Sequence, residues 1–418
     1  MRRLLPAAVS LLMGMSFLGG GPARAGGLNR PTGVGTRASG LSGAFVGLAD
    51  DASAVFYNPA GLTTLRQTDL SLGLETMFLF RKVQPPGWGV EKAQVPNGVL
   101  PYVFVGGRFV VGDGAHLAFG FGAFNSFGGM VHFGQRPISE GVVDTKIGLY
   151  EFQPTVAYEV SRRVHIGASL RIGMGYFSVT KGCGDLLSCS QGRPAAEFMV
   201  LDTIYGVAFG YSLGILIEPV DGLRLGVSYR SNMNVDVKGT NVVHSGDKSY
   251  DADARIPFPQ SLALGASYWV HPKVLLSFQV DWTDNSRFQE LVVRPAGLDM
   301  PRDMVATYMD WKDSIAVHLG AEGRINRFVT LRGGLSYDSR AVPKETARRD
   351  TDDADKVGVD VGVTVHFGRW RIESALDLLF GDLANGFQKE TYPSNFASPG
   401  VHFPGGILSF HVGAGVVF

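Results

Sequence analysis

The side chains with the most distinctive chemistry in this sequence are arginines placed among apolar residues. An arginine guanidinium can hold a carboxylate through two parallel hydrogen bonds. An amphipathic acid needs such a cation together with an apolar tunnel for its tail. The arginines that alternate with apolar residues are Arg171, Arg224, Arg230, Arg324 and Arg332. Arg171, Arg230 and Arg332 are candidate contacts for a bound carboxylate; the alternative is that each pairs with an acidic residue or with the N-terminal segment.

The sequence contains no credible catalytic or metal-binding pattern. The nine histidines are scattered, with no His-Glu-x-x-His pair and no Cys/His cluster at metal-ligand spacing. The glycines Gly33, Gly35 and Gly40 lack the Lys-Ser/Thr that completes a phosphate-binding loop. An acidic stretch at 350–355 could bind a divalent ion, although such runs are usually solvated. We therefore expect no enzymatic activity, no cofactor and no metal.

Composition favours a large β-structure. The chain has 418 residues, with 38 basic and 38 acidic side chains, so its net charge does not indicate a nucleic-acid partner. Charged residues make up 18% of the chain and 56 residues are glycine, whereas soluble domains carry about 25% charged residues. Few charges and many small residues are typical of long strands with one apolar and one small-residue face.

The N-terminus predicts export. Arg2 and Arg3 precede a short apolar run at 4–18, and Ala23-Arg24-Ala25 is a typical cleavage site, so residues 1–25 read as a signal peptide. No later segment offers the roughly 18 consecutive apolar residues that a transmembrane helix needs. If the chain crosses a membrane, it must do so with strands.

Strict alternation of apolar and small or polar residues predicts such strands. One example covers thirteen residues, with apolar side chains at Val164, Ile166, Ala168, Leu170, Ile172, Met174 and Tyr176. Several such bands end in aromatic residues, and short turns alternate with long polar links, as in outer-membrane barrels. The predicted spans are 67–83, 98–110, 115–128, 147–160, 164–180, 203–219, 223–237, 258–270, 274–293, 312–325, 328–339, 356–367, 370–380 and 405–418. We therefore predict an all-β protein, a 14-stranded antiparallel transmembrane β-barrel.

A barrel of this size is too wide for its own side chains to close, and the N-terminal segment can fill it. We predict a plug, or hatch, with short helices at 26–66 and the barrel at 67–418. Asp50 and Asp51 occupy positions suited to the start of a short helix at 52–57. Asn58 must leave helical geometry because Pro59 follows it.

The chain end and the two cysteines add two expectations. Phe418 ends an alternating strand. We expect the bacterial barrel-insertion machinery to recognise this terminal aromatic residue. The predicted location is the bacterial outer membrane, in contact with its lipids. Cys183 and Cys189 could close a small disulfide loop in an oxidising compartment; the alternative is two free thiols.

The stretch GAFVGLADDASAVFYNPAGL and the later blocks PFPQS, VDWTDNSRFQEL and LRGGLSYDSRAVP resemble the FadL/TodX family of outer-membrane transporters for long-chain fatty acids and hydrocarbons. The resemblance covers almost the whole mature chain. It implies a hatch signature at Asn58, Pro59 and Ala60. It also implies an inward kink in the third strand at Asn125, Ser126, Phe127 and Gly128, which opens the wall sideways; an ordinary rim bulge is the alternative.

The resemblance implies transport of hydrophobic molecules, with long-chain fatty acids as the expected cargo and lateral release at this kink. We expect passive transport, because the outer membrane has no ATP and the chain has no nucleotide site. Aromatic hydrocarbons or other lipids are the alternative cargo. A general porin for small hydrophilic solutes is the alternative from another class, and it would need an open, charged lumen. We expect a monomer whose partners are its hydrophobic ligand and the membrane.

Overall fold

The structure is a computed structural model that describes residues 33–80, 82–84, 89–92, 98–111, 115–132, 142–181, 199–245, 248–297, 306–348, 353–382, 389–392, 400–402 and 405–418. The predicted signal peptide at 1–25 and both Cys183 and Cys189 lie outside these residues. The expected disulfide therefore stays a prediction, as do the boundaries of the hatch at 26–66 and of the barrel at 67–418.

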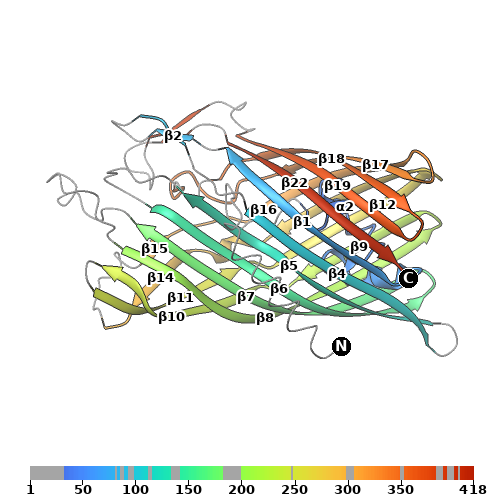
Figure 1. Ribbon diagram of the computed structural model, residues 1–418, viewed down its shortest axis with the longest axis horizontal. Coiled ribbons are helices and arrows are strands. Elements are labelled where there is room, and N and C mark those ends of the chain that lie inside the picture. The colour runs from blue at the N-terminus through green and yellow to red at the C-terminus, as the bar shows by residue number, and fades with distance from the viewer. Residues whose placement is uncertain are drawn as a thin grey trace.

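The long strands form one closed antiparallel barrel of fourteen staves (Figure 1), where a stave is one strand or two consecutive strands that continue each other. Ten staves are the single strands β1 (Asp69–Phe80), β4 (Gly98–Val111), β5 (Ala115–His132), β6 (Val142–Ser161), β7 (Val164–Lys181), β8 (Met199–Val220), β17 (Val329–Asp338), β18 (Lys356–Phe367), β19 (Trp370–Gly381) and β22 (Gly406–Val417). The barrel closes because β1 pairs with both β22 and β4. The predicted fold class is confirmed.

Four staves are interrupted. They are β9 (Leu223–Arg230) with β10 (Met233–Ser245), β11 (Lys248–Phe258) with β12 (Ser261–His271), β13 (Val274–Thr283) with β14 (Glu290–Pro295), and β15 (Ala306–Tyr308) with β16 (Ser314–Arg324). A 3-10 turn, η2 (Asn285–Arg287), joins β13 to β14. A small separate sheet contains β20 (Glu390–Tyr392), β21 (Gly400–His402), β2 (Lys82–Gln84) and β3 (Glu91–Lys92). We call the rim near turns 162–163, 221–222 and 368–369 the short-turn end and the opposite rim the long-link end.

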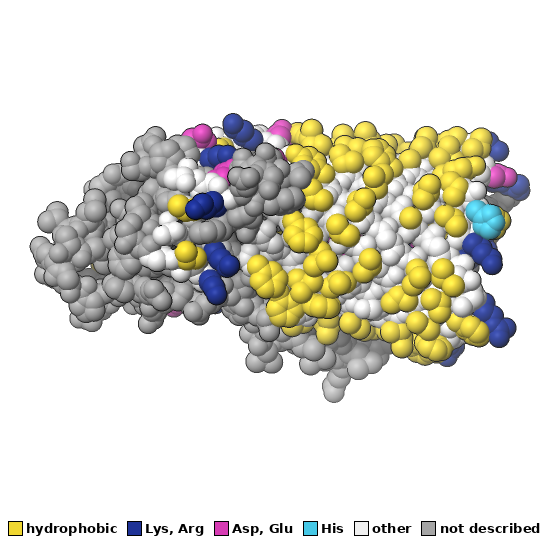
Figure 2. All heavy atoms as spheres, turned by 90° about the horizontal axis from the view of Figure 1, so that it is seen from above, with side chains coloured by type: hydrophobic (Ala, Val, Ile, Leu, Met, Phe, Trp, Pro, Cys, Tyr) yellow, Lys and Arg dark blue, Asp and Glu magenta, His cyan; other side chains and the backbone are white. Residues whose placement is uncertain are grey.

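The outer wall carries the apolar band that the alternation predicts. Ile166, Leu170, Leu213, Leu225 and Leu264 are among its exposed side chains. Figure 2 shows hydrophobic side chains as a broad band on one face of the barrel, with Lys and Arg at the edge near the short-turn end. Among the described residues, no helix combines the length and the apolar character needed to cross a membrane.

Two of the four interrupted staves reverse their facing at the break, and one of them corrects a predicted strand. The predicted span 274–293 is also interrupted, between the end of β13 at Thr283 and the start of β14 at Glu290. The span 223–237 was expected to be continuous, but it breaks at 231–232 between β9 and β10. Before the break Leu225 and Val227 face outward; after it Val235 and Val237 are buried inside. The cause is Ser231, which turns onto β8, because its N–H donates to the Tyr211 carbonyl at 2.9 Å and its hydroxyl accepts from the Tyr211 N–H at 2.9 Å. The same reversal separates β11 from β12 at 259–260.

Residues 33–65 lie inside the barrel toward the short-turn end, where Figure 1 shows α2 enclosed by strands. They contain α2 (Thr36–Ser39), α3 (Ala54–Tyr57) and the 3-10 turn η1 (Pro59–Thr64). Leu41, Phe45 and Leu48 are fully buried there. We keep the name hatch for these described residues.

The predicted start of the hatch helix is displaced by two residues. Ser53, not Asp50 or Asp51, is the N-cap of α3. The two carboxylates are drawn away from the helix axis by Arg37, whose NH1 lies 2.6 Å from Asp50 Oδ1 and 3.2 Å from Asp51 Oδ2. Asp51 Oδ1 also accepts from the Ser53 N–H at 2.9 Å. Asn58 leaves helical geometry as predicted, with φ −155° and ψ 102°.

Candidate functional site

The predicted Asn-Pro-Ala turn joins the hatch to the barrel wall. Asn58 Nδ2 donates to the carbonyls of Val46 at 3.1 Å and of Ile215, in β8, at 3.0 Å. Asn58 Oδ1 accepts from the Ala60 N–H at 3.2 Å and so caps η1. One amide side chain therefore holds together its own turn, the preceding hatch segment and the wall.

Three wall glycines make room for this contact. A Cβ on Gly214 of β8 would overlap Asn58 Oδ1 and lie 2.9 Å from Pro59 Cδ. A Cβ on Gly167 of β7 would lie 2.5 Å from the Ala60 nitrogen, and one on Gly226 of β9 would lie 2.8 Å from the Val46 carbonyl carbon. Real Cβ contacts are longer than these distances, so glycine is required for the hatch to touch the wall here.

Further hydrogen bonds attach the hatch around the barrel. Gln279 of β13 accepts from the N–H groups of Phe45 at 2.9 Å and Val46 at 2.8 Å. His318 Nδ1 of β16 lies 2.6 Å from the Ser42 carbonyl oxygen, and His165 Nδ1 of β7 lies 2.8 Å from Thr63 Oγ1. The hatch is thus bonded to the wall by polar groups that its buried backbone would otherwise leave unpaired.

The predicted kink residues lie at an irregularity of β5. The β5–β6 register shifts between Asn125 and Phe127, so Ser126 is the extra residue of a bulge. As a result Phe124 and Phe127 both point inward, although they are three residues apart, and both are buried. Phe124 packs against the hatch residue Phe56 with ring centroids 5.1 Å apart. Gly128 continues the ladder after the bulge by pairing with Gly148.

The wall beside this bulge lacks a hydrogen-bond ladder. Pairing between β4 and β5 ends at Val103 and Ala123. Beyond that point, among the described residues, positions 98–102 of β4 pair only with β1 and positions 124–132 of β5 pair only with β6. Asn125 Nδ2 is buried at this gap and has no hydrogen-bond partner within the described ranges. We call this stretch the β4–β5 gap.

Two of the three candidate arginines form a buried triad with Glu151 of β6. Arg171 of β7 binds this carboxylate through Nε and NH2, both at 2.7 Å. Arg230 of β9 binds it through NH2 at 2.8 and 3.0 Å and donates from NH1 to the hatch carbonyl of Phe56 at 3.2 Å. Their side chains are 1%, 5% and 0% exposed for Arg171, Arg230 and Glu151. Two guanidiniums share one carboxylate, so the triad carries one excess positive charge.

Arg332 of β17 lies in a different network. Its Nε is 2.7 Å from Glu322 Oε2 and its NH1 donates to Thr364 Oγ1 at 2.6 Å. The hatch residue Arg37 contacts the same carboxylate oxygen at 3.1 Å. Burial alone would raise the pKa of the Asp51 carboxyl, but the positive charges of Arg37 and Arg371 outweigh burial and hold that pKa below its ordinary value. The contacts of all three candidate arginines match the alternative stated above, pairing with lumen acids and with the hatch.

A polar cluster that sequence reasoning missed lies where α2 meets β18, β19 and β22. His411 Nε2 lies 2.7 Å from Asp377 Oδ2, and His411 Nδ1 lies 3.3 Å from the hatch hydroxyl of Ser39. The neighbouring hatch hydroxyl of Ser42 donates to Asp360. Residue pairs such as Ser39 and His411 are 372 positions apart, so no local pattern could have found them.

An apolar cluster fills the lumen between the hatch and the long-link end. We call it the upper lumen cluster; its members include Phe127, Leu149, Ile204, Met233, Val235, Val237, Ile256, Phe258, Leu291, Val293 and Trp311. It reaches the kink directly, because the rings of Phe127 and Phe258 lie 5.8 Å apart. It exists because β10 and β11 turn their apolar side chains inward after the stave breaks. The only sequence signal for it is the Ser231-Asn232 and Pro259-Gln260 interruptions.

Comparisons with known proteins support this architecture. Residues 22–386 match the family model described as "Outer membrane protein transport protein (OMPP1/FadL/TodX)". The chain is 22% identical to the 47 kDa outer membrane protein of Pasteurella multocida over 79% of this chain and 82% of the relative. It is 23% identical to the long-chain fatty acid transport protein of Escherichia coli O6:H1 over 79% of this chain and 81% of the relative.

Solved structures show the same fold. A FadL homologue of Pseudomonas aeruginosa superposes with a TM-score of 0.75 at 17% identity, covering 92% of this chain and 98% of that one. The toluene transporter TodX of Pseudomonas putida gives a TM-score of 0.68 at 17% identity, covering 93% and 99% of the two chains.

Proposed function

Because this chain belongs to the OMPP1/FadL/TodX family of outer membrane transport proteins, we propose that its cargo is a long-chain fatty acid. Members of this family transport hydrophobic substrates across the bacterial outer membrane, and the family is one of transporters and channels rather than enzymes. The buried hatch leaves no open charged lumen among the described residues at the short-turn end, so the geometry favours this function over a general porin.

The observation that carries the proposed cargo is the position of the triad. Glu151 and the two arginines lie beside Phe127 and Leu149, at the hatch side of the upper lumen cluster. An alkyl chain gains about 25 cal/mol for each Å² buried against such a cluster. The guanidinium groups of Arg171 and Arg230 at this level suit a carboxylate at the end of that chain, since a guanidinium holds a carboxylate through charge-assisted hydrogen bonds. An aromatic hydrocarbon would use the apolar cluster but not the charge.

A comparison of an acid with its ester tests the cargo. The purified full chain in detergent should bind palmitic acid at least about tenfold more tightly than methyl palmitate, because one charge-assisted hydrogen bond contributes about 1.5–3 kcal/mol. Isothermal titration calorimetry measures both affinities. Equal affinities for the acid and the ester would contradict a fatty-acid cargo and favour the hydrocarbon alternative.

For release we propose the β4–β5 gap. The wall opens there without breaking a ladder, because the described β4 and β5 residues on either side of the gap do not pair with each other. Phe127 connects the gap to the upper lumen cluster, and Phe124 connects it to the hatch. Cargo that passes this point can leave sideways into the membrane, where its alkyl chain stays in an apolar solvent.

The double variant Asn125→Val with Gly128→Val tests lateral release. Two β-branched residues favour a regular strand and fill the space beside the bulge, so most of the uptake of radiolabelled palmitic acid should be lost. The matched control is Gly333→Val on β17, where an added Cβ meets only one atom, at 3.9 Å. Normal uptake by a double variant that is inserted at wild-type levels would argue against the lateral route.

A further inference from the structure

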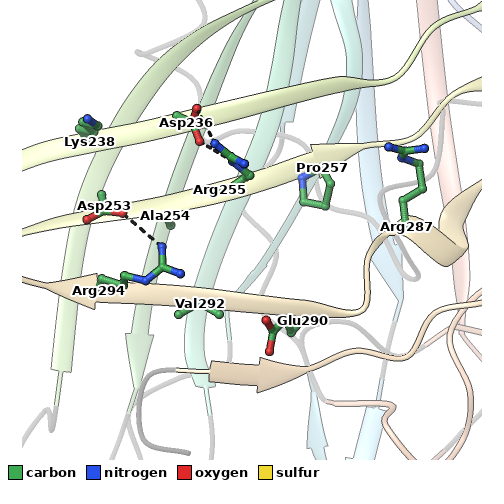
Figure 3. A pocket seen from close by; sticks show the side chains of 10 residues that line it. All are labelled: Asp236, Lys238, Asp253, Ala254, Arg255, Pro257, Arg287, Glu290, Val292 and Arg294. Atoms are coloured by element: carbon green, nitrogen blue, oxygen red, sulfur yellow. Dashed lines mark hydrogen bonds and ion pairs between the residues drawn. The ribbon is translucent and has the colours of Figure 1, made fainter. Parts of the chain in front are cut away.

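A charged hollow lies on the outer wall of the barrel, on the three adjacent strands β10, β11 and β14. It encloses about 570 Å³ and is lined by side chains of these strands and of η2. Figure 3 shows the lining spread along the three strands, with Arg255 turned toward Asp236 and Arg294 toward Asp253. Ligand-binding pockets generally measure about 300–1,000 Å³. The basic members are Lys238, Arg255, Arg287 and Arg294, and the acidic members are Asp236, Asp253 and Glu290. The lining thus has an excess of one positive charge.

The facing reversal places this hollow outside the barrel. Val235, Val237, Ala254 and Ile256 are buried in the lumen, so the residues between them on β10 and β11 point away from it. On the same staves nearer the short-turn end, the outward residues are apolar. The outer wall therefore changes from apolar to charged at the stave breaks, as it must where a barrel leaves the hydrocarbon core.

Aromatic residues mark this boundary just below the hollow. Tyr229 and Tyr211 face outward with ring centroids 5.9 Å apart, and aromatic residues line the membrane interface in such barrels. The Tyr229 hydroxyl donates to Gln260 at 2.8 Å. Pro257, which lines the hollow, is only three residues from Gln260, across the break between β11 and β12. The hollow is therefore at the level of the lipid headgroups.

Two of the basic side chains form ion pairs with acidic residues on the neighbouring strand. Arg255 Nε lies 2.6 Å from Asp236 Oδ1 across β10 and β11, and Arg294 NH1 lies 3.6 Å from Asp253 Oδ2 across β11 and β14. Arg255 binds Asp236 through both Nε and NH2, which leaves its NH1 as the donor for a ligand. The Arg255 and Arg294 side chains remain 66% and 64% exposed. The Lys238 ammonium group makes no hydrogen bond or ion pair with any described residue. It is available as a third donor.

The hollow lies toward the long-link end, and long loops are on the extracellular side in such barrels. We propose that this hollow binds the phosphorylated sugar headgroup of a glycolipid in the outer leaflet. Guanidinium groups hold phosphate oxygens bidentately, and Lys238 adds a point charge. The interspersed carboxylates, which would disfavour a plain anion, accept hydrogen bonds from sugar hydroxyls. A mixed lining at headgroup height therefore fits a phosphosugar better than a soluble anion. The site is on the opposite face of the wall from the proposed cargo pathway, so it is independent of it.

Binding of lipid A to the detergent-purified full chain, measured by native mass spectrometry, tests this site. The bisphosphorylated form should bind at least about tenfold more tightly than the dephosphorylated form, because each charge-assisted contact contributes about 1.5–3 kcal/mol. The variant Arg255→Gln with Arg294→Gln should lose this preference. Its fold should persist, since exposed ion pairs contribute only about 0–1 kcal/mol.

The matched control is Arg162→Gln with Lys273→Gln, which removes two positive charges at the exposed short-turn end and should bind lipid A as the wild type does. Equal binding of the two lipid forms, or an unchanged preference in the Arg255/Arg294 variant, would overturn the proposal. Displacement of the lipid by an equal concentration of inorganic phosphate would also overturn it, because the occupant would then be a soluble anion. Palmitic acid uptake should be the same in all these variants.

Discussion

Replacing Glu151 by glutamine is expected to destabilise the barrel by ~3–5 kcal/mol, the usual effect of removing one partner from a buried ion pair. The substitution keeps the shape of the side chain but removes the negative charge that Arg171 and Arg230 share. Both arginines are almost completely buried, so water cannot take its place. Urea titration of the protein in lipid vesicles, followed by the gel mobility of folded and unfolded forms, measures the change.

The control for this prediction is Glu218→Gln. Glu218 Oε1 pairs with Arg224 Nε at 2.5 Å, but the two side chains are 28% and 24% exposed, so the loss should stay within about 1 kcal/mol. If cargo binds as we propose, palmitic acid should restore part of the stability of Glu151→Gln, and methyl palmitate should not. An equal, small effect of the Glu151 and Glu218 substitutions would show that the triad does not act as a buried ion pair.

Replacing Gly214 by valine is expected to displace the hatch from the barrel wall. The new Cβ would overlap Asn58 Oδ1 and crowd Pro59, and the wall strand cannot retreat because β8 is bonded to β7 and β9 on both sides. Overpacking of this kind costs about 1–3 kcal/mol of stability. We expect the Asn-Pro-Ala turn to move away from β8, because this movement removes the overlap. We expect the variant to admit small sugars that the wild type excludes, measured by swelling of proteoliposomes.

Gly323→Val on β16 provides the comparison, because a Cβ at Gly323 meets nothing within 4 Å. This variant should exclude sugars as the wild type does. If the Gly214 variant still excludes small sugars at equal incorporation into liposomes, the contact between Asn58 and β8 does not hold the hatch in place.

The barrel could be predicted because its strands are encoded locally. In β7 the outward residues Ile166 and Leu170 alternate with the small or polar residues that face the hatch, and this period of two is visible without any partner strand. The predicted span 356–367 coincides with β18 (Lys356–Phe367) for the same reason, since Gly368 and Arg369 form a tight turn next to it. The resemblance implied an inward kink at 125–128, and the structure has a bulge at Ser126.

The roles of the arginines could not be predicted in the same way. Arg171 and Arg230 were selected because they lie on the lumen side of their strands, and that placement is correct. Their shared partner Glu151 is 20 residues from one and 79 from the other. Whether a lumen arginine meets a ligand or a carboxylate depends on strand register, and register is a property of the closed sheet.

The sequence by itself determined the number of staves, their antiparallel order and the position of the Asn-Pro-Ala turn, because alternation and turn residues act over a few neighbours. Only the tertiary structure decided which way the apolar residues of each stave face along its whole length. At 231–232 and 259–260 the sequence alternation continues in phase while the backbone turns over, and this reversal creates both the upper lumen cluster and the charged hollow outside it. The same side-chain pattern thus faces outward below the break and into the lumen above it, because its facing is set by bonds such as that from Ser231 to Tyr211 on the neighbouring strand.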